Sequence, residues 1–115
     1  MSSDPVVADI DPESARQLVD GGALLLDVRE DDEWEAGHAP VAVHLAMGLV
    51  AEEIDTIPVD RVVVCVCRVG GRSAAVAAAL TEAGFTVHNL DGGMLAWEQA
   101  GLPVVALDGG PGRVI

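Results

Sequence analysis

The stretch from Arg61 to Ala83 most strongly limits what this chain can fold into. It begins with the apolar run VVVCV, continues through the short loop CRVGGRS and ends in a segment rich in alanine. An apolar run without polar alternation predicts a strand covered on both faces, as in a parallel sheet. The alanine-rich segment predicts a helix over residues 73–83. A strand that leads directly into a helix indicates an α/β architecture.

The rest of the chain repeats this alternation. Asp11 and Pro12 mark the start of a helix that ends at Gly21 and Gly22. Turn and capping residues separate the other elements. Strands are predicted over residues 23–28, 42–45, 61–66 and 86–90, and helices over residues 31–36, 49–57, 73–83 and 94–100.

These elements predict one α/β domain over residues 1–115, with a mainly parallel central sheet flanked by helices on both faces. Its core is expected to span about residues 10–104. Residues 105–115, where glycine and proline displace any periodic pattern, are expected to form a loosely ordered tail.

Composition excludes several classes of partner. The net charge of −13 argues against nucleic acid and anionic membranes, which require a basic surface. The apolar runs are too short to cross a membrane, and residues 1–13 lack the pattern of a leader peptide. Two cysteines one residue apart do not form a disulfide framework, so a reducing compartment and a cytoplasmic location are expected. A Cys-x-Cys pair without a second cluster predicts no metal site, and Gly92-Gly93 predicts no nucleotide cofactor.

The loop CRVGGRS combines features that stabilise a thiolate at Cys67. It lies between the carboxyl end of a predicted strand and the N-terminus of a predicted helix, where α/β sheets bind ligands. Gly70 and Gly71 allow loop N–H groups to converge on one anion. Arg68 and Arg72 add positive charge to a chain with only six basic residues. These features predict a reactive Cys67. The alternative is that Cys67 is a small packed hydrophobic residue and that the arginines are surface residues of a turn.

The length of the loop indicates which anion it holds. Four residues separate Cys67 from Arg72. The phosphatase signature has one more residue between its cysteine and its arginine, which widens the ring of amides enough for a phosphoryl group. The shorter loop favours a single sulfur atom carried on the cysteine.

Three stretches, in order, resemble the motifs of single-domain rhodaneses, the family of thiosulfate sulfurtransferases. LLLDVREDDEWEAGHAPVAVHL is similar to the first motif of that family, although Val41 stands where a glycine is usual. VVVCVCRVGGRS is similar to the active-site strand and its six-residue loop, and VHNLDGGMLAWEQAGLPV to the closing motif. The resemblance covers about residues 10–104.

The resemblance implies a rhodanese-like three-layer fold and sulfur transfer through a Cys67 persulfide. It implies that Arg68, Val69, Gly70, Gly71 and Arg72 bind the substrate, and it requires no cofactor. The expected partners are a small donor such as thiosulfate and a thiol, protein or cyanide acceptor, with the protein acting as a monomer or weak homodimer. Two alternatives remain: a sulfur-carrier module that docks one partner protein, and a phosphatase or arsenate reductase on the same fold.

Several other residues have a structural and a functional interpretation. Cys65 is expected to be a buried core residue, with a resolving thiol as the alternative. Trp34 and Trp97 are expected to anchor the core. A third group is expected to fix the end of one strand to the following turn, with a place at the substrate mouth as the alternative: Asp27, Arg29, Glu30 and His38.

Overall fold

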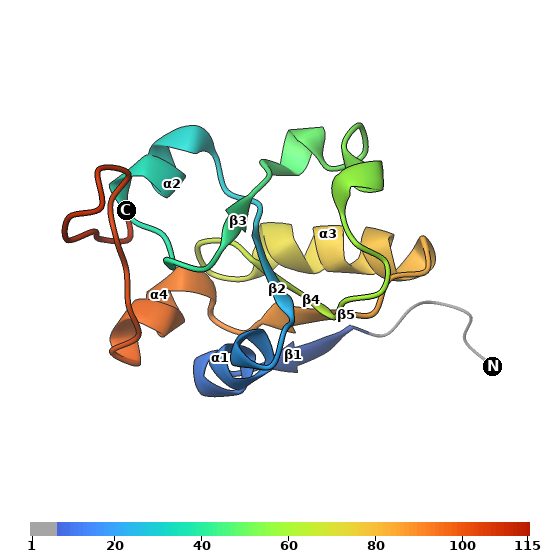
Figure 1. The fold of residues 1–115 in the computed structure, drawn as a ribbon, viewed down its shortest axis with the longest axis horizontal. Helices are drawn as coiled ribbons and strands as arrows, with labels where there is room; N and C mark the ends of the chain where they lie inside the picture. The colour runs from blue at the N-terminus through green and yellow to red at the C-terminus, as the bar shows by residue number, and fades with distance from the viewer. Residues whose placement is uncertain (1–6) are drawn as a thin grey trace.

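The computed structural model describes residues 7–115. The expectation of no leader peptide rests partly on residues 1–6 and lies outside the described residues. Five strands form one sheet in which every adjacent pair is parallel, in the order β1-β5-β4-β2-β3 (Figure 1). The strands are β1 (Ala8–Ile10), β2 (Leu24–Asp27), β3 (Val43–His44), β4 (Val63–Val66) and β5 (Val87–Leu90).

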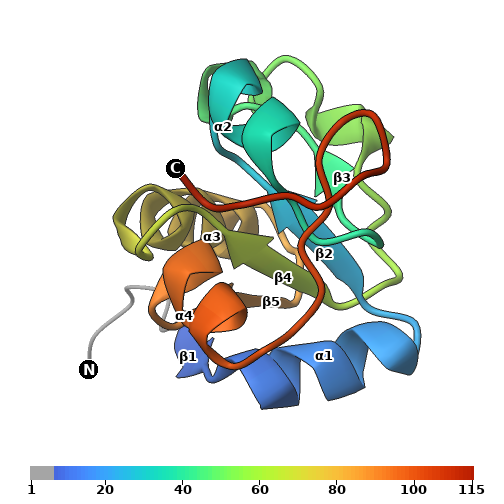
Figure 2. The same cartoon turned by 90° about the vertical axis from the view of Figure 1, so that its left-hand side faces the viewer.

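Helices cover both faces of this sheet, so the predicted α/β fold with a parallel sheet is confirmed (Figures 1 and 2). Helix α3 packs on one face together with two short 3-10 turns, and α1 and α4 pack on the other. The helices are α1 (Pro12–Asp20), α2 (Asp31–Ala36), α3 (Gly71–Glu82) and α4 (Gly93–Gln99), and the turns are η1 (Met47–Leu49) and η2 (Ile54–Thr56).

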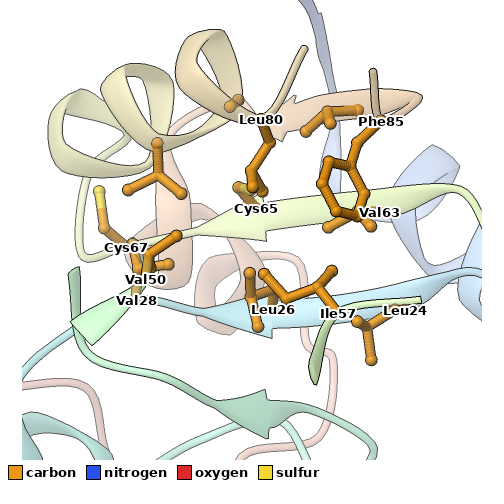
Figure 3. Packing of buried hydrophobic residues seen from close by; sticks show 13 residues of the cluster. Leu24, Leu26, Val28, Val50, Ile57, Val63, Cys65, Cys67, Leu80 and Phe85 are labelled. Carbon is orange, nitrogen blue, oxygen red and sulfur yellow. The ribbon is translucent and has the colours of Figure 1, made fainter. Parts of the chain in front are cut away.

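Strand β4 shows why the apolar runs have no polar alternation. Val63 and Cys65 face the cluster beneath α3 (Figure 3). Val64 and Val66 face the cluster beneath α1 and α4. All four are fully buried, so each face of the strand needs an apolar side chain. Cys67, at the end of the strand, belongs to the α3 cluster as Cys65 does.

The helix predicted over residues 49–57 does not form. Instead η1 and η2 are joined by irregular turns, and both ends of the segment are anchored by the buried side chains of Val50 and Ile57. The hydroxyl of Thr56 donates to the carbonyl of Glu53 at 2.6 Å, a local bond that competes with helix. Several β-branched residues lower the helix propensity, so packing decides the conformation.

Two further elements differ from the prediction. The edge strand β1 was not predicted, because its three residues are too few for a recognisable pattern. Helix α3 begins at Gly71, two residues before the predicted start, because Gly70 adopts φ 114° and forms the N-cap. Arg72 therefore projects from the first turn of a helix. Within residues 7–115, no helix has the length and apolar character needed to cross a membrane.

The segment expected to be a loosely ordered tail makes defined contacts. Val105 forms antiparallel bridges with His38 and Pro111. The chain then returns between α2 and α4, where the N–H of Arg113 donates to the carbonyl of Ala36 at 3.0 Å (Figure 2). The N–H of Val114 donates to Glu98 Oε2 at 3.0 Å. The tail thus connects two helices that flank the loop after β4.

Candidate active site

The loop Cys67–Arg72 lies where the order of strands reverses. Strand β4 pairs with β2 on one side and with β5 on the other, and the connections leaving β2 and β4 run to opposite edges of the sheet. Ligands of open α/β sheets bind beyond the carboxyl ends of the strands at such a position. The loop leaves β4 there and leads directly into the N-terminus of α3.

The sulfur of Cys67 is surrounded by hydrogen-bond donors. The N–H of Gly70 donates to Sγ at 3.1 Å, and the hydroxyl of Ser73 lies 3.3 Å from it. Only 1% of Cys67 is exposed, and this burial alone would raise the pKa of the thiol. Hydrogen bonds from the Ser73 hydroxyl and from the N–H groups of Ser73, Gly70 and Val69 reverse the effect and lower the pKa below its ordinary value. The loop therefore stabilises a thiolate.

The N-terminus of α4 holds the opposite side of this loop. The N–H of Met94 donates to the carbonyl of Cys67 at 2.8 Å, and the N–H of Leu95 donates to the carbonyl of Arg68 at 3.1 Å. In a planar trans peptide the N–H points away from the carbonyl. Because the two carbonyls point toward α4, the N–H groups of the same two peptides point away from α4, toward the side of the loop that holds the sulfur. A Cβ on Gly93 would lie 2.4 Å from the carbonyl oxygen of Arg68, so only glycine permits this approach.

The two loop arginines occupy different environments. Arg72 forms two parallel bonds to the carboxylate of Glu33 on α2, of 2.7 and 2.9 Å. The hydrogen bond from Arg72 lowers the pKa of Glu33 to about 2, and the pKa of Arg72 is raised by the same contact. Arg68 is exposed, and its Nε donates to the carbonyl of Ile115 at 3.0 Å. The structure thus places Arg72 in an internal ion pair rather than free above the sulfur.

The cluster expected at the end of β2 is structural. Asp27 and Arg29 are fully buried and joined by a bidentate ion pair, with a shortest contact of 2.8 Å. Arg29 Nη2 also donates to the carbonyl of Gly37 beyond α2, at 2.8 Å. Glu30 forms a capping box with Glu33 at the start of α2. The interpretation that this group fixes the strand end to the following turn is confirmed for Asp27, Arg29 and Glu30.

The aromatic residues divide between the core and the surface. Trp97 is buried as expected, with 2% exposed. Trp34 is half-buried, and its ring stacks with the rings of His38 and His44, at centroid distances of 3.7 and 4.9 Å. His38 Nδ1 lies 2.7 Å from the carbonyl of Trp34. Trp34 therefore fastens α2 to β3 instead of filling the core.

Cys65 is a core residue in this structure. It is fully buried, and burial raises the pKa of its thiol to about 12, with a smaller contribution from the Cys67 charge. Both cysteines are free thiols.

Val41, which stands where the family motif usually has glycine, is exposed in a turn. A 3.0 Å bond from the N–H of Ala42 to the carbonyl of Ala39 closes this turn. Among residues 7–115, no three His, Cys, Asp or Glu side chains gather as a metal ion requires.

The comparisons with known proteins agree with this geometry. The model of the rhodanese-like domain matches residues 11–100. The chain belongs to the rhodanese-like family. A sulfurtransferase of Allochromatium vinosum is 43% identical over 107 residues, 90% of this chain and 100% of the relative. The thiosulfate sulfurtransferase GlpE of Pseudomonas syringae is 39% identical over 89 residues, 76% of this chain and 84% of the relative.

A solved rhodanese-related protein from Thermoplasma volcanium superposes with a TM-score of 0.80 at 26% identity, covering 85% of this chain and 97% of that one. Together with the named relatives, this supports a sulfurtransferase activity in general terms for this member of the rhodanese-like family.

The structure also reveals site residues that the sequence did not single out. Glu33, Gly93 and Asn89 all contact the loop from distant parts of the chain. Ser73 directly follows the loop in the sequence and lies in the first turn of α3. This position could have predicted that its hydroxyl lies near Cys67. Nothing in the sequence marks Glu33 or Asn89 as partners of the loop.

Proposed function

We propose that this protein is a sulfurtransferase whose nucleophile is Cys67, taking sulfane sulfur from thiosulfate or a persulfide donor. One observation carries the proposal: the buried sulfur of Cys67 lies within a ring of hydrogen-bond donors at the reversal point of the sheet. Such donors stabilise a thiolate and, equally, the charged outer sulfur of a persulfide. The name of the GlpE relative supports thiosulfate as a donor.

Two displacement steps follow from this arrangement. The thiolate of Cys67 attacks the outer sulfur of thiosulfate, a bond forms between the two sulfur atoms, and sulfite leaves with the electron pair of the broken bond. The persulfide then carries its negative charge on the terminal sulfur. A thiolate or cyanide attacks that atom, the sulfur–sulfur bond breaks, and the Cys67 thiolate is restored. No external oxidant, reductant or cofactor is needed.

The remaining loop residues receive distinct roles in this proposal. Arg68, Val69, Gly70 and Gly71 form the substrate-binding segment, with Arg68 as the cation that meets an anionic donor. Arg72 braces the loop through Glu33. The same pairing argues against a phosphatase, because the arginine that would bind phosphoryl oxygens is already occupied.

The proposed setting follows from the free thiols and the acidic surface. We place the protein in the cytoplasm, since both cysteines are free thiols. We also propose that it acts as a monomer or weak homodimer. Its partners are the sulfur donor and a thiol or protein acceptor, with no nucleic acid or membrane, given the net charge of −13.

Intact-mass spectrometry after thiosulfate treatment tests the proposal. The protein is expected to gain the mass of one sulfur atom, and cyanide should remove it. Cys67→Ser should gain nothing, because a serine hydroxyl without an adjacent base is a far weaker nucleophile. Cys65→Ser, the matched control in the same strand, should still form the persulfide. Absence of a mass gain in the wild-type protein under excess donor, or a gain in Cys67→Ser, would contradict the assignment.

A further inference from the structure

Asn89 lies on β5, outside the loop, yet its side chain contacts the site through two groups. Only 3% of the residue is exposed. Its Nδ2 donates to Asp9 Oδ1 and to the carbonyl of Gly70, each at 3.2 Å. Its Oδ1 accepts from the hydroxyl of Ser73 at 2.6 Å. Because both partners of Nδ2 are acceptors, rotating the amide would place oxygen against oxygen, so the orientation of Oδ1 toward Ser73 is fixed.

The hydroxyl of Ser73 has one proton and three acceptors within reach. The oxygen of Asn89 is the nearest, at 2.6 Å, and Cys67 Sγ and the carbonyl of Gly70 each lie at 3.3 Å. Ser73 is fully buried, so water does not supply another partner. A hydroxyl can rotate about its bond to Cβ, but it donates to one strong acceptor at a time. Asn89 and Cys67 therefore compete for the same proton.

The two steps of sulfur transfer change the charge on Cys67 Sγ. In the thiolate, Sγ carries the charge and attracts the Ser73 proton. In the persulfide the charge lies on the terminal sulfur, and Sγ becomes a weak acceptor. A buried hydroxyl whose only other acceptor is the carbonyl of Gly70, at 3.3 Å, would be poorly satisfied at that moment. The oxygen of Asn89 is placed to take the proton and to satisfy the hydroxyl.

We propose that Asn89 is a positioning residue for sulfur transfer: its Oδ1 accepts the Ser73 hydroxyl when Cys67 Sγ is uncharged and releases it when Sγ is a thiolate. This proposal rests on the proposed function. The charged groups that contact the cluster or lie on the adjoining loop and helix start are Asp9, which orients the Asn89 amide, Arg68 on the loop, and Arg72 in its pair with Glu33. None of these groups contacts the Ser73 hydroxyl among the bonds found in the described residues.

A double-mutant cycle with Ser73 tests this role. Asn89→Leu keeps the branched shape of the side chain and removes the competing acceptor, so Ser73 should donate to Sγ permanently. The apparent pKa of Cys67, measured from the pH dependence of alkylation by iodoacetamide and mapped by peptide, should fall by about one unit, a tenfold gain in thiolate below that pKa. The same substitution in Ser73→Ala should leave the pKa unchanged. Thr81→Val, which removes another α3 hydroxyl far along the helix, is the control and should have no effect.

A merely structural role gives a different result. If Asn89 only supports the carbonyl of Gly70, Asn89→Leu loosens the loop, and the pKa of Cys67 rises equally with and without Ser73. That outcome, or an unchanged pKa of Cys67 in Asn89→Leu, overturns the proposal. Asn89→Ala is measured in parallel, so that the test can still be made if Asn89→Leu does not fold.

Kinetics supply a second readout. In Asn89→Leu, the rate of sulfur uptake from thiosulfate, divided by the fraction of Cys67 present as thiolate, should be lower than in the wild-type protein, although the rate of alkylation is higher. If both rates change in the same direction, the proposal is overturned. Alkylation needs no donor, so the cycle reports on Asn89 even if Cys67 fails to take sulfur from thiosulfate. The failure of the proposed function would instead appear as an absent mass gain in the wild-type protein.

Discussion

At the scale of single residues, the two arginines of the loop show how partners decide function. Arg72 shares its charge with Glu33 through two bonds, and only 14% of the Glu33 side chain is exposed. Arg68 contacts a backbone carbonyl and remains exposed to solvent. Under the proposed function, an anionic donor would therefore meet the charge of Arg68, because the charge of Arg72 is already paired with Glu33.

This difference predicts the effect of removing Arg68. In Arg68→Ala the KM for thiosulfate should rise about tenfold, because a hydrogen bond to a charged group contributes about 1.5–3 kcal/mol. The kcat should change little, since the donors around Cys67 Sγ, where the proposed persulfide would form, are backbone N–H groups and the Ser73 hydroxyl and not Arg68. Arg113→Ala, which removes an exposed arginine from the tail, is the matched control and should leave KM unchanged. Steady-state kinetics with cyanide as the acceptor measure both, and an unchanged KM in Arg68→Ala would show that Arg68 does not meet the donor.

The sequence identified residues that act within one contiguous stretch and missed those that act across the fold. Cys67 and the glycines are neighbours in the chain, and their predicted chemistry follows from a strand, a loop and a helix start. Ser73 follows directly after this loop, and no role was predicted for it from the sequence. The pair of Arg72 and Glu33 joins positions 39 residues apart, and the bond of Ser73 to Asn89 joins positions 16 apart. Such pairs depend on the strand order, which a single sequence does not reveal.

At the scale of elements, the loop is held between two helix N-termini. Helix α3 continues from the loop, and Gly70 forms its N-cap. Helix α4 donates its first free N–H groups to the outward carbonyls of Cys67 and Arg68. These N–H groups have no partner within their own helix. The same bonds therefore cap α4 and set the direction of the peptides that face the sulfur.

The close contact between α4 and the loop predicts an unequal effect of two glycine substitutions. Gly93→Ala and Gly101→Ala both force alanine into positive φ, of 61° and 76°, at a cost of about 1–2 kcal/mol. A Cβ at Gly101 meets nothing within 4 Å, whereas at Gly93 it collides with the loop backbone. Gly93→Ala should therefore lose about 1–3 kcal/mol more in the free energy of unfolding.

Chemical denaturation measures this difference, and alkylation of Cys67 provides the functional readout. In Gly93→Ala the added methyl group should displace the loop N–H groups that donate to Cys67 Sγ, so the pKa of Cys67 should rise. In Gly101→Ala these N–H groups stay in place, and the pKa should be unchanged. Equal losses of stability in the two variants would mean that the loop yields to the added methyl group without strain.

The elements also show where local signals fail. The runs at β2 and β4 and the helix α3 were predicted because each is long or strongly patterned. The segment 49–57 has the apolar spacing of a helix, but several of its residues are poor helix formers. The chain buries Val50 and Ile57 by forming two separate 3-10 turns instead of one helix. Periodicity indicated which side chains are buried and left open the backbone that buries them.

At the scale of the whole molecule, the carboxyl edge of the sheet gathers the parts of the site. Strand β2 leads to the buried Asp27–Arg29 pair and to α2, which carries Glu33. Strand β4 leads to Cys67, and β5 carries Asn89 and leads to α4. The sulfur environment thus depends on three adjacent strands in one order, and α/β topology brings them together.

The tail completes this arrangement from outside the sheet, which predicts the effect of removing it. Residues 105–115 bond to Ala36 at the end of α2 and to Glu98 on α4, and the half-buried side chain of Val114 packs on the second core cluster. Deleting them should lower the free energy of unfolding by about 2 kcal/mol, from the lost burial of half-buried valines. For a domain of this size the melting temperature should fall by roughly 10 °C.

Persulfide formation should nevertheless survive the deletion, because within residues 7–115 every donor found for Cys67 Sγ comes from residues 69–73. Leu107→Ser, at an exposed position of the same tail, is the control and should change neither property. Thermal denaturation and intact-mass spectrometry after thiosulfate treatment measure the two effects separately. A truncated protein that folds but gains no sulfur would show that the tail belongs to the site itself, through its contact with Arg68. A truncated protein with unchanged melting temperature would show that the bonds to α2 and α4 contribute nothing to stability.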